Sequence, residues 1–459
     1  MLSDRPYAVS RSGAPSFAES VYPLTRLERD QDVVAVRAQR PIRREAFLRD
    51  VAALSARLPD RPYVLNLCSD RYRFMVGFGA ALCRNQVSLL PPSSTPATLC
   101  ALKADYPDLY ALADKTSALA PTLTFPNDLD HAGAVTGVPA FPGTQPAIIL
   151  FTSGSTGKPK PVPKSWGVLV RSALAAGARL GMPRLEGATL IGTVPHQHSY
   201  GLESMVLLGL QHGAVVDAGQ PFYPADVRSA LEATQQPRIL VTTPVHLKAL
   251  VAEPGGMPQA DLVLSATAPL PVLLAAQTEA CFRAPLLEIY GCTEAGQVAS
   301  RRTVQEPHWH SFDGVDLRMD AQGMWASGAA VEGRVLLHDI IEEVSLGRFL
   351  LGGRSADLVD VAGKRTSLAY LNHHLLSIDG VVDGVFVVPE TDGSHFTRMA
   401  ALVVAPNVPH DEILRELRER IDTAFLPRPL VFIDSLPRDP LGKLPREALL
   451  QLIERGRST

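Results

Sequence analysis

The stretch AIILFTSGSTGKPK at residues 147–160 says most about how this sequence folds. It begins with an apolar run typical of a buried strand and continues with hydroxyl side chains, two glycines and two lysines. Glycines let backbone N–H groups approach an anion, hydroxyls add donors, and lysines offset the charge of phosphate. The stretch therefore predicts a strand that ends in a phosphate-binding loop, and it is less typical of a flexible surface turn.

This loop differs from the common nucleotide-binding loop. A Walker A sequence places four residues between its glycines before the lysine, whereas Gly154 and Gly157 are separated by two. The chain also carries no protein-kinase motif. A kinase or P-loop NTPase is therefore the weaker of the phosphate-chemistry hypotheses.

The rest of the chain predicts an α/β fold. Between residues 28 and 140, helix-like segments (44–58 and 74–82) alternate with strand-like segments (63–67 and 87–90). More short apolar runs bounded by turn residues follow at 147–151, 188–194, 213–218, 238–243 and 261–266. Repeated units of this kind are typical of parallel sheets covered on both faces.

Composition excludes several classes of protein. With 459 residues the chain is too long for one core, and two or three domains are expected. A net charge of −3 argues against a nucleic-acid partner, and no apolar run has the length of a signal peptide core or a membrane span. The five cysteines are scattered and show no metal-ligand spacing. We expect a reduced, cytoplasmic protein without membrane insertion or a structural metal.

At residues 152–160 the chain resembles the ANL superfamily of adenylating enzymes, which includes acyl-CoA synthetases, adenylation domains and luciferases. The loop of that family, T-S-G-[ST]-T-G-x-P-K, is matched throughout, and Pro161 replaces the glycine that usually follows. The resemblance implies ATP and Mg²⁺ as cofactors and a reaction in two steps, in which a carboxylic acid becomes an acyl-adenylate and then a thioester. Both steps use one site, so a mobile domain is expected.

Two parts of unequal size are predicted. The resemblance implies a large N-terminal domain of parallel-sheet α/β layers at residues 1–353 and a hinge at 354–357. A small mobile α+β domain follows at 358–459, where the pattern changes to short strands and an amphipathic helix at 411–424.

Further motifs appear in the order of the family. YGCTE at 290–294 matches Y-G-x-T-E, in which Glu294 would help to hold Mg²⁺ and Thr293 would meet the phosphate or the carboxylate. SATAPL at 265–270 resembles the stretch that flanks adenine, with Ala266 in place of glycine. The resemblance places Glu288 near the adenine amino group, stacks Tyr290 on the base, and gives Asp339 the ribose hydroxyls.

The C-terminal motifs imply the moving parts. GRSAD at 353–357 supplies Arg354 for the ribose and Asp357 as the hinge, and Gly363 and Arg365 would enter the site with the thiol arm. Asp360 replaces the lysine that usually precedes them. In LPRDPLGK at 436–443, Lys443 would reach the carboxylate and the α-phosphate, where a cation offsets the repulsion between two anions.

The resemblance thus assigns roles to many residues. Catalysis is assigned to Lys443, Thr293, Glu294 and His198, with Glu294 also the metal ligand. Nucleotide binding is assigned to Thr152, Ser153, Gly154, Ser155, Thr156, Gly157, Lys158, Lys160, Thr267, Ala268, Pro269, Glu288, Ile289, Tyr290, Asp339 and Arg354. Substrate binding is assigned to His198, Tyr200, Gly201, His246, Gly291 and Cys292.

The acid is expected to be aromatic. PHQHSYG at 195–201 matches P-x-x-H-x-[YF]-G, with His198 as the gate between the acyl pocket and the thiol tunnel and residues 200–203 along the pocket. Tyr200, two histidines and short residues suit a flat aromatic acid with a polar substituent better than a fatty acid. Cys292 is expected to be a pocket wall, because the chemistry needs no enzyme nucleophile. The chain looks similar to aryl-acid ligases of aryl-polyene (xanthomonadin-type) pigment pathways, which load 3-hydroxybenzoate onto an acyl carrier protein.

Two questions stay open: which thiol accepts the acyl group, and whether the chain is an enzyme or a ligand sensor. Carrier proteins are acidic, and a basic rim could come from Arg415, Arg418, Arg428, Arg438 and Arg446. Glu416 and Glu419 on the same helix make an ordinary solvated face equally consistent. An aryl- or fatty-acyl-CoA synthetase is the alternative, and the alternative from another class is a non-catalytic ligand sensor. Lys443, Glu294 and the intact loop argue against a sensor.

Overall fold

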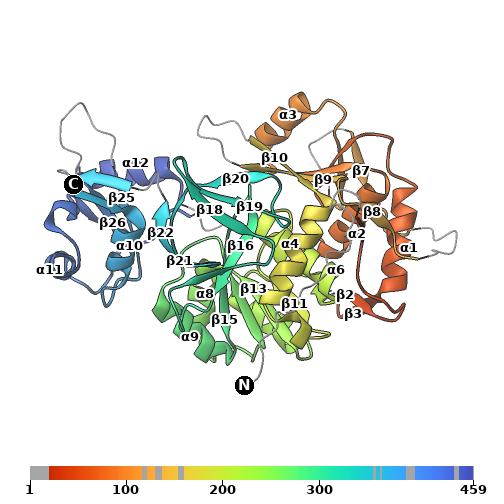
Figure 1. The fold of residues 1–459 in the computed structure, drawn as a ribbon. Coiled ribbons are helices and arrows are strands. Elements are labelled where there is room, and N and C mark those ends of the chain that lie inside the picture. Colours follow the sequence, from red (N-terminus) through yellow and green to blue (C-terminus); the bar gives the residue numbers. More distant parts are fainter. Residues whose placement is uncertain are drawn as a thin grey trace, which may run out of the picture.

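The computed structural model describes the chain in nine stretches, and these define where the predictions can be compared with structure. They are residues 20–91, 93–115, 121–129, 137–152, 160–354, 358–361, 364–388, 399–438 and 444–457. Figure 1 shows the C-terminal elements, coloured blue, gathered in a lobe beside β21 and β22 of the larger part.

A six-stranded sheet carries the phosphate loop. Its strand order is β10-β9-β5-β4-β6-β7, and every neighbouring pair is parallel except β9 and β10. The bounds are β4 Tyr63–Asn66, β5 Val87–Leu90, β6 Tyr110–Ala113, β7 Thr122–Thr124, β9 Pro146–Thr152 and β10 Lys160–Ser165. The predicted strands at 63–67, 87–90 and 147–151 are confirmed. Proline has no backbone N–H to donate to a neighbouring strand, and Pro161 and Pro163 are tolerated because β10 is an edge strand.

An eleven-stranded sheet forms the second layer, in the order β21-β22-β17-β16-β15-β14-β13-β11-β12-β2-β3. The bounds are β2 Val33–Arg37, β3 Arg40–Arg43, β11 Thr189–Gly192, β12 Val215–Asp217, β13 Arg238–Thr242, β14 Leu262–Ser265, β15 Leu286–Cys292, β16 Gly296–Arg301, β17 Trp309–Ser311, β21 Asp339–Ser345 and β22 Arg348–Arg354. The block from β15 to β2 is parallel as predicted, and the strands outside it run antiparallel. The sheet is therefore mixed, not purely parallel.

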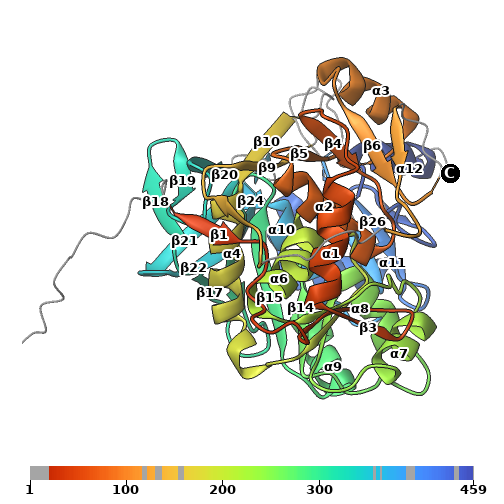
Figure 2. The same ribbon diagram turned by 90° about the vertical axis from the view of Figure 1, so that its right-hand side faces the viewer.

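Helices join the two sheets into one core. Helix α4 (Trp166–Arg179) contacts β9 and β10 of one sheet and β16 of the other. Its first residue, Trp166, is fully buried, and the largest apolar cluster contains Ile148, Trp166 and Leu190 from both sheets and from α4. Helices α1 (Arg44–Ser55) and α2 (Arg71–Cys83) lie side by side (Figure 2). Further helices of this part are α3 Pro96–Asp105, α7 Pro224–Glu232, α8 Pro244–Val251 and α9 Val272–Phe282.

One helix contains an irregular turn. It runs from α5 (Ser199–Gly201) through a π-helical turn at Leu202–Leu207 into α6 (Leu208–His212), and Gly213 ends it in the left-handed conformation. π-Turns inside α-helices are frequent at functional sites. This turn follows the predicted acyl-binding segment directly.

The C-terminal lobe has the predicted α+β character. It contains β23 Leu358–Val361, β24 Lys364–Ser367, α10 Leu368–Leu376, β25 Asp383–Val387, β26 Ala400–Val404, α11 His410–Arg420, β27 Leu430–Phe432 and α12 Arg446–Arg457. Its buried apolar residues form two clusters that have no member before Val359. This separation supports the predicted division near residue 354, which stays a prediction.

The predicted helix at 411–424 is too long. Helix α11 ends at Arg420 because Ile421 is extended and Asp422 caps a separate 3₁₀ turn at Thr423–Phe425 by accepting from the N–H of Ala424.

Smaller antiparallel units complete the fold: β1 Val21–Pro23 with β8 Ala140–Pro142, and β18 Asp316–Asp320 with β19 Gly323–Ser327 and β20 Arg334–Leu337. Among the helices in the described stretches, none combines the length and the apolar composition that crossing a membrane requires.

Candidate active site

The predicted phosphate loop connects two paired strands. Thr152, at the end of β9, lies opposite Lys160, at the start of β10, in the antiparallel register. Thr152 is half-buried and Lys160 is exposed. The other assigned loop residues, Ser153, Gly154, Ser155, Thr156, Gly157 and Lys158, lie outside the described residues. Both ends of the loop are therefore fixed by one hairpin.

The YGCTE motif forms a tight hairpin between β15 and β16. Cys292 pairs with Gly296, and a Cβ on Gly291 would lie 2.2 Å from the carbonyl oxygen of Gly296, so only glycine fits there. Thr293 and Glu294 stand at the tip of the turn, partly exposed. Mg²⁺ binds to proteins through one or two carboxylates and otherwise through phosphates and water. A single accessible carboxylate at Glu294 fits that requirement.

Cys292 is not prepared for nucleophilic chemistry. Burial raises the pKa of its thiol to about 11, and its sulfur accepts a hydrogen bond from the N–H of Ala295. A protonated thiol is a weak nucleophile, which agrees with its predicted role as a pocket wall.

Three predicted nucleotide residues meet, although they are far apart in the sequence. The Tyr290 hydroxyl donates to Asp339 Oδ2 at 2.7 Å. Asp339 begins β21 and lies opposite Arg354 in the β21–β22 register. The Tyr290 ring packs 5.7 Å from the ring of Trp309 and 5.9 Å from that of Phe349. This convergence gives one surface an aromatic ring and a carboxylate.

The predicted adenine stretch follows β14 with a strained backbone. Thr267 has φ +81°, which is rare for a β-branched residue, and its neighbours Ala268 and Pro269 are partly or fully exposed. Ser265, just before this turn, pairs with Glu288 on β15. Such outliers concentrate at ligand sites, and this one lies just after the carboxyl end of β14.

Glu288 is already partnered. Its Oε2 accepts from Arg301 Nε at 2.8 Å and from Thr303 Oγ1 at 2.9 Å. Burial raises the pKa of Glu288, and the Arg301 guanidinium opposes that shift. Ile289 is buried in the core, so only its backbone could meet a nucleotide. Contact of Glu288 with adenine stays a prediction and would require the carboxylate to be shared with Arg301.

Sequence reasoning missed Arg301. Its guanidinium lies 4.4 Å from the Trp309 ring centre and also pairs with Glu288, so it braces the wall behind Tyr290. The sequence holds no motif around Arg301 that marks it as part of the site.

The predicted acyl segment is held at its first end by two hydrogen bonds, one from an imidazole and one from a side-chain amide. His196 Nε2 and Gln197 Nε2 each lie 2.9 Å from the carbonyl oxygen of Cys68. His196 is fully buried, and burial lowers the pKa of its imidazole to about 3, with Arg71 adding to the shift. His198 and Tyr200 follow, both half-buried. Gly201 is required by packing, because a Cβ there would lie 2.0 Å from the Pro195 carbonyl oxygen.

A fully buried arginine organises the same region. The two terminal nitrogens of Arg71 donate to carbonyl oxygens at and just after the ends of β11 and β12. These acceptors are Asp217 at 2.6 Å, Gly219 at 2.5 Å, Gly192 at 3.1 Å and Val194 at 3.3 Å. We call Cys68, Arg71, His196 and Gln197 the sheet junction.

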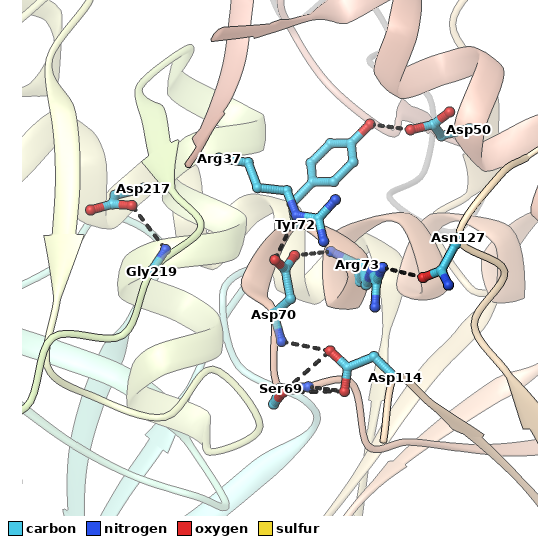
Figure 3. Close-up of polar contacts among 10 residues, drawn as sticks. All are labelled: Arg37, Asp50, Ser69, Asp70, Tyr72, Arg73, Asp114, Asn127, Asp217 and Gly219. Atoms are coloured by element: carbon cyan, nitrogen blue, oxygen red, sulfur yellow. Dashed lines mark hydrogen bonds and ion pairs between the residues drawn. The ribbon is translucent and has the colours of Figure 1, made fainter. Parts of the chain in front are cut away.

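Figure 3 shows the supports of the sheet junction at the start of α2. Asp70 accepts from the N–H of Arg73 at 2.9 Å and from Arg37 Nε at 2.7 Å. Asp114, after β6, accepts from the N–H groups of Ser69 and Asp70, each at 2.9 Å. The segment that carries Arg71 is therefore fixed from two sides.

His246, which the sequence analysis assigned to substrate binding, lies in α8. Its Nδ1 is 3.1 Å from Thr243 Oγ1, and its ring packs edge-on against Phe222 at 5.2 Å. Burial lowers the pKa of His246, so the ring is neutral near pH 7.

Two buried charges lie at the second end of the acyl segment: Glu203, which the sequence analysis placed along the pocket, and Lys164, which it did not single out. Glu203 accepts from Ser199 Oγ at 2.6 Å and from the N–H of Gln297 at 3.0 Å. Lys164 on β10 donates to the carbonyl oxygen of Glu294. Strand alternation was the available signal, because Lys164 shares the inward face of β10 with Val162. We call these two residues the Lys164–Glu203 pair.

The C-terminal lobe faces the nucleotide surface across a cleft. The cleft has a volume of about 1240 Å³ and is lined by residues 268–273 and Arg301 on one side and by residues 376–388 on the other. Lys248 Nζ on α8 lies 3.5 Å from Asp383 Oδ1 and 3.4 Å from the Val382 carbonyl oxygen across it. Asp357, Gly363 and Lys443 lie outside the described residues, as do the side chains of Arg354 and Arg365.

The predicted basic rim is partly neutralised. Arg415 lies 3.3 Å from Glu412 and 3.7 Å from Glu416, and Arg438 lies 2.9 Å from Asp383. These pairs weaken the argument for an acidic carrier partner, which stays a prediction.

Comparison with known proteins identifies a family and a fold. The model of the family described as AMP-binding enzyme matches residues 85–321. The indoleacetate–CoA ligase of Aromatoleum aromaticum is 26% identical over 375 residues, 71% of each chain. The 3-hydroxybenzoate–CoA/4-hydroxybenzoate–CoA ligase of Thauera aromatica is 24% identical, and the match covers 66% of each chain. A 4-coumarate–CoA ligase of Rhodobacter capsulatus is 34% identical over 154 residues, 34% of this chain and 39% of that ligase.

Among solved structures, O-succinylbenzoate coenzyme A synthetase from Bacillus subtilis, in complex with ATP and magnesium, superposes with a TM-score of 0.77 at 18% identity. The superposition covers 92% of this chain and 97% of that one. The predicted fold class is thereby confirmed.

Proposed function

This chain belongs to the AMP-binding enzyme family, and from that premise we propose that it activates an aromatic carboxylic acid with ATP and passes the acyl group to a thiol. The family match and the ligases among its relatives make it an enzyme, an AMP-forming acid–thiol ligase. Which acid and which thiol it uses belong to the proposal.

The contact between Tyr290 and Asp339 carries the proposal. Asp339 offers carboxylate oxygens to ribose hydroxyls, while its bond from Tyr290 fixes its direction. The β9–β10 loop offers N–H groups and lysines to phosphates. Mg²⁺, when bound at Glu294, offsets part of the phosphate charge.

The reaction has two balanced steps. A carboxylate oxygen of the acid attacks the α-phosphorus, and the bond from that phosphorus to the pyrophosphate leaving group breaks. A thiol sulfur then attacks the acyl carbon, loses its proton, and displaces AMP. Lys443 would offset the charge during the first step, and rotation of residues 358–459 about residues 354–357 would admit the thiol through Gly363 and Arg365.

The favoured acid is a hydroxybenzoate, with 3-hydroxybenzoate first. The half-buried His198 and Tyr200, together with the glycine-tight turn at Gly291, support a flat pocket for a ring. A relative named for 3- and 4-hydroxybenzoate supports the same class of acid.

Two acceptors are proposed. The phosphopantetheine thiol of an acyl carrier protein, supplied by another chain, follows from the resemblance to aryl-polyene ligases. Coenzyme A is supported by the names of the relatives and by the paired arginines of α11. A position in the cytoplasm stays a prediction.

The test measures acyl-AMP and thioester formation separately. Hydroxybenzoates, coumarate, acetate and octanoate are each incubated with ATP and either CoA or a holo carrier protein, with Lys443→Ala as the inactive control. Hydroxybenzoyl-AMP followed by a thioester supports the proposal, and the better thiol decides the acceptor. Acyl-AMP from octanoate alone would refute the aromatic acid, and binding without acyl-AMP from any acid would favour a sensor.

A further inference from the structure

The Lys164–Glu203 pair lies where the proposed chemistry does not require charge. Lys164 is 3% exposed and Glu203 is 7% exposed. One comes from the edge strand that leaves the phosphate loop, and the other lies in the π-turn that follows the acyl segment. Buried charges are retained only when they are partnered. Packing alone therefore does not explain why two charged side chains are buried here.

The hydrogen bonds of the pair leave capacity for another partner. A lysine ammonium has three donors, and within the described part of the chain Lys164 uses one, toward the Glu294 carbonyl. Among the described residues, each carboxylate oxygen of Glu203 accepts one bond, Oε1 from Ser199 and Oε2 from Gln297, although each oxygen has two lone pairs. The pair can thus still donate and accept.

A small cavity lies against the Lys164–Glu203 pair. It measures about 10 Å³ and is lined by Lys164, Glu203, Ser172, Ala295 and Gly296, and otherwise by apolar side chains. Such a volume accommodates roughly one water-sized group. Gly296 has φ +83°, and a Cβ there would stand 3.3 Å from Glu203 Oε2, so glycine keeps the space open.

The cavity adjoins the turn that carries the predicted pocket residues Gly291 and Cys292. Ala295 and Gly296 close the turn that begins with Gly291 and Cys292, and Cys292 was assigned to the pocket wall. A ring that enters past His198 and Tyr200 would point its far edge at this turn. A substituent on that edge would then be the group that meets the pair.

We propose that the Lys164–Glu203 pair is the polar end of the acyl pocket and selects acids whose ring carries a hydroxyl or another small hydrogen-bonding group. This inference rests on the proposed aromatic acid activation and names the feature of the acid that is read. A hydroxyl would donate to Glu203 and accept from Lys164. An acid without that group leaves both charges short of a partner, and sites of this kind discriminate strongly for that reason.

The test compares 3-hydroxybenzoate with benzoate and with 3-methylbenzoate, which matches the hydroxyl in size. The wild-type kcat/KM for acyl-AMP formation should favour the hydroxyl acid at least tenfold. Lys164→Met and Glu203→Gln should each reduce that preference at least fivefold while benzoate is still activated. An unchanged preference would overturn the inference.

A structural role of Lys164 is separated by a second readout. Because Lys164 also holds the Glu294 carbonyl, the KM for ATP and the Mg²⁺ dependence are measured in the same variants. If kcat/KM for all three acids falls by the same factor and the KM for ATP rises, Lys164 only positions the turn that carries Glu294, and the inference is wrong. Preference lost at an unchanged KM for ATP supports it.

Folding is controlled with two more variants. The double variant Lys164→Met/Glu203→Gln removes both charges and leaves neither unpaired. Lys103→Met removes a lysine that donates to two backbone carbonyls, those of Pro107 and Leu109, away from the site, and it should keep the wild-type preference. If the wild-type enzyme activates no acid, the proposed function fails. If it activates all three acids equally, only this inference fails.

Discussion

Arg71 in the sheet junction and Lys164 in the Lys164–Glu203 pair are both buried cations, but their hydrogen bonding differs. Arg71 is fully buried and spends four donors on backbone carbonyls. Lys164 is 3% exposed and makes one such bond among the described residues. Only the Nε–H of Arg71 has no hydrogen-bond partner among the described residues, so this buried cation is bonded mostly to backbone and belongs to the scaffold. A buried cation with most of its donors left over lies where something else is to bind.

The largest effect is expected from Arg71→Met. Four buried carbonyl oxygens would lose their donor, and breaking buried charged contacts of this kind lowers the free energy of unfolding by about 3–5 kcal/mol. Urea denaturation of the variant measures it. Lys164→Met should lower the free energy of unfolding by less than Arg71→Met does. Equal losses in the two variants would remove the contrast between scaffold and site.

Acid should weaken the sheet junction through His196. The pKa of His196 is about 3 in the folded chain, and an unfolded histidine titrates near pH 6.5. Between these values the unfolded chain takes up a proton that the folded chain does not, so the free energy of unfolding falls as pH drops from 6.5 toward 3. The full loss is roughly 3–5 kcal/mol.

Denaturation of wild-type protein and of His196→Gln across this pH range isolates the histidine. The glutamine keeps a donor for the Cys68 carbonyl but does not titrate, so the variant should show the shallower decline. Parallel curves would mean that His196 is not the group that responds to acid.

A smaller effect is expected at the nucleotide surface. Asp339→Asn removes the charge offered to ribose and weakens the bond from Tyr290, and we expect the KM for ATP to rise about tenfold, equivalent to about 1.4 kcal/mol. Tyr290→Phe removes only the hydroxyl and should raise it roughly threefold, in line with one hydrogen bond of about 0.5–1.5 kcal/mol.

Both changes are measured by ATP–pyrophosphate exchange at a series of ATP concentrations. The KM for the acid serves as the internal control. A rise in the KM for the acid instead would place Asp339 outside the nucleotide site.

The smallest effect is expected from Lys248→Ala at the cleft. This lysine is 37% exposed, and exposed ion pairs contribute about 0–1 kcal/mol. The free energy of unfolding should change by less than about 0.5 kcal/mol. Arg228→Ala, which removes a comparable pair with Glu253 at 3.4 Å within one part of the molecule, is the matched control. A large loss with Lys248→Ala alone would mean that the cleft contact holds the two parts together.

Local pattern carried much of the prediction. The strands at 63–67, 87–90 and 147–151 were found because each is an apolar run bounded by turn residues. Tyr290 and Asp339 were both assigned to the nucleotide, and the structure joins them by one hydrogen bond. The motifs therefore assigned to one site two residues, 49 positions apart, that the structure brings into contact.

Long-range packing set the limits of that prediction. The stretch around Arg71, SDRYRF, looks like a solvated helix start, and only the carbonyls of residues 192–219 show why it is buried. Lys164 follows two prolines, which obscure the strand that carries it. The antiparallel strands beyond β15 were missed because the apolar pattern does not report direction.

The π-turn at Leu202–Leu207 bears on how substrate preference is compared between relatives. A π-turn accommodates one more residue than an α-helical turn, so side chains on either side of it no longer follow the usual i, i+4 spacing. An alignment that carries a helical relative through residues 199–212 without a gap would misplace by one the positions that follow the inserted residue. Specificity codes for this segment should therefore be aligned from Gly201 forward and from Gly213 backward, with the inserted residue left between them.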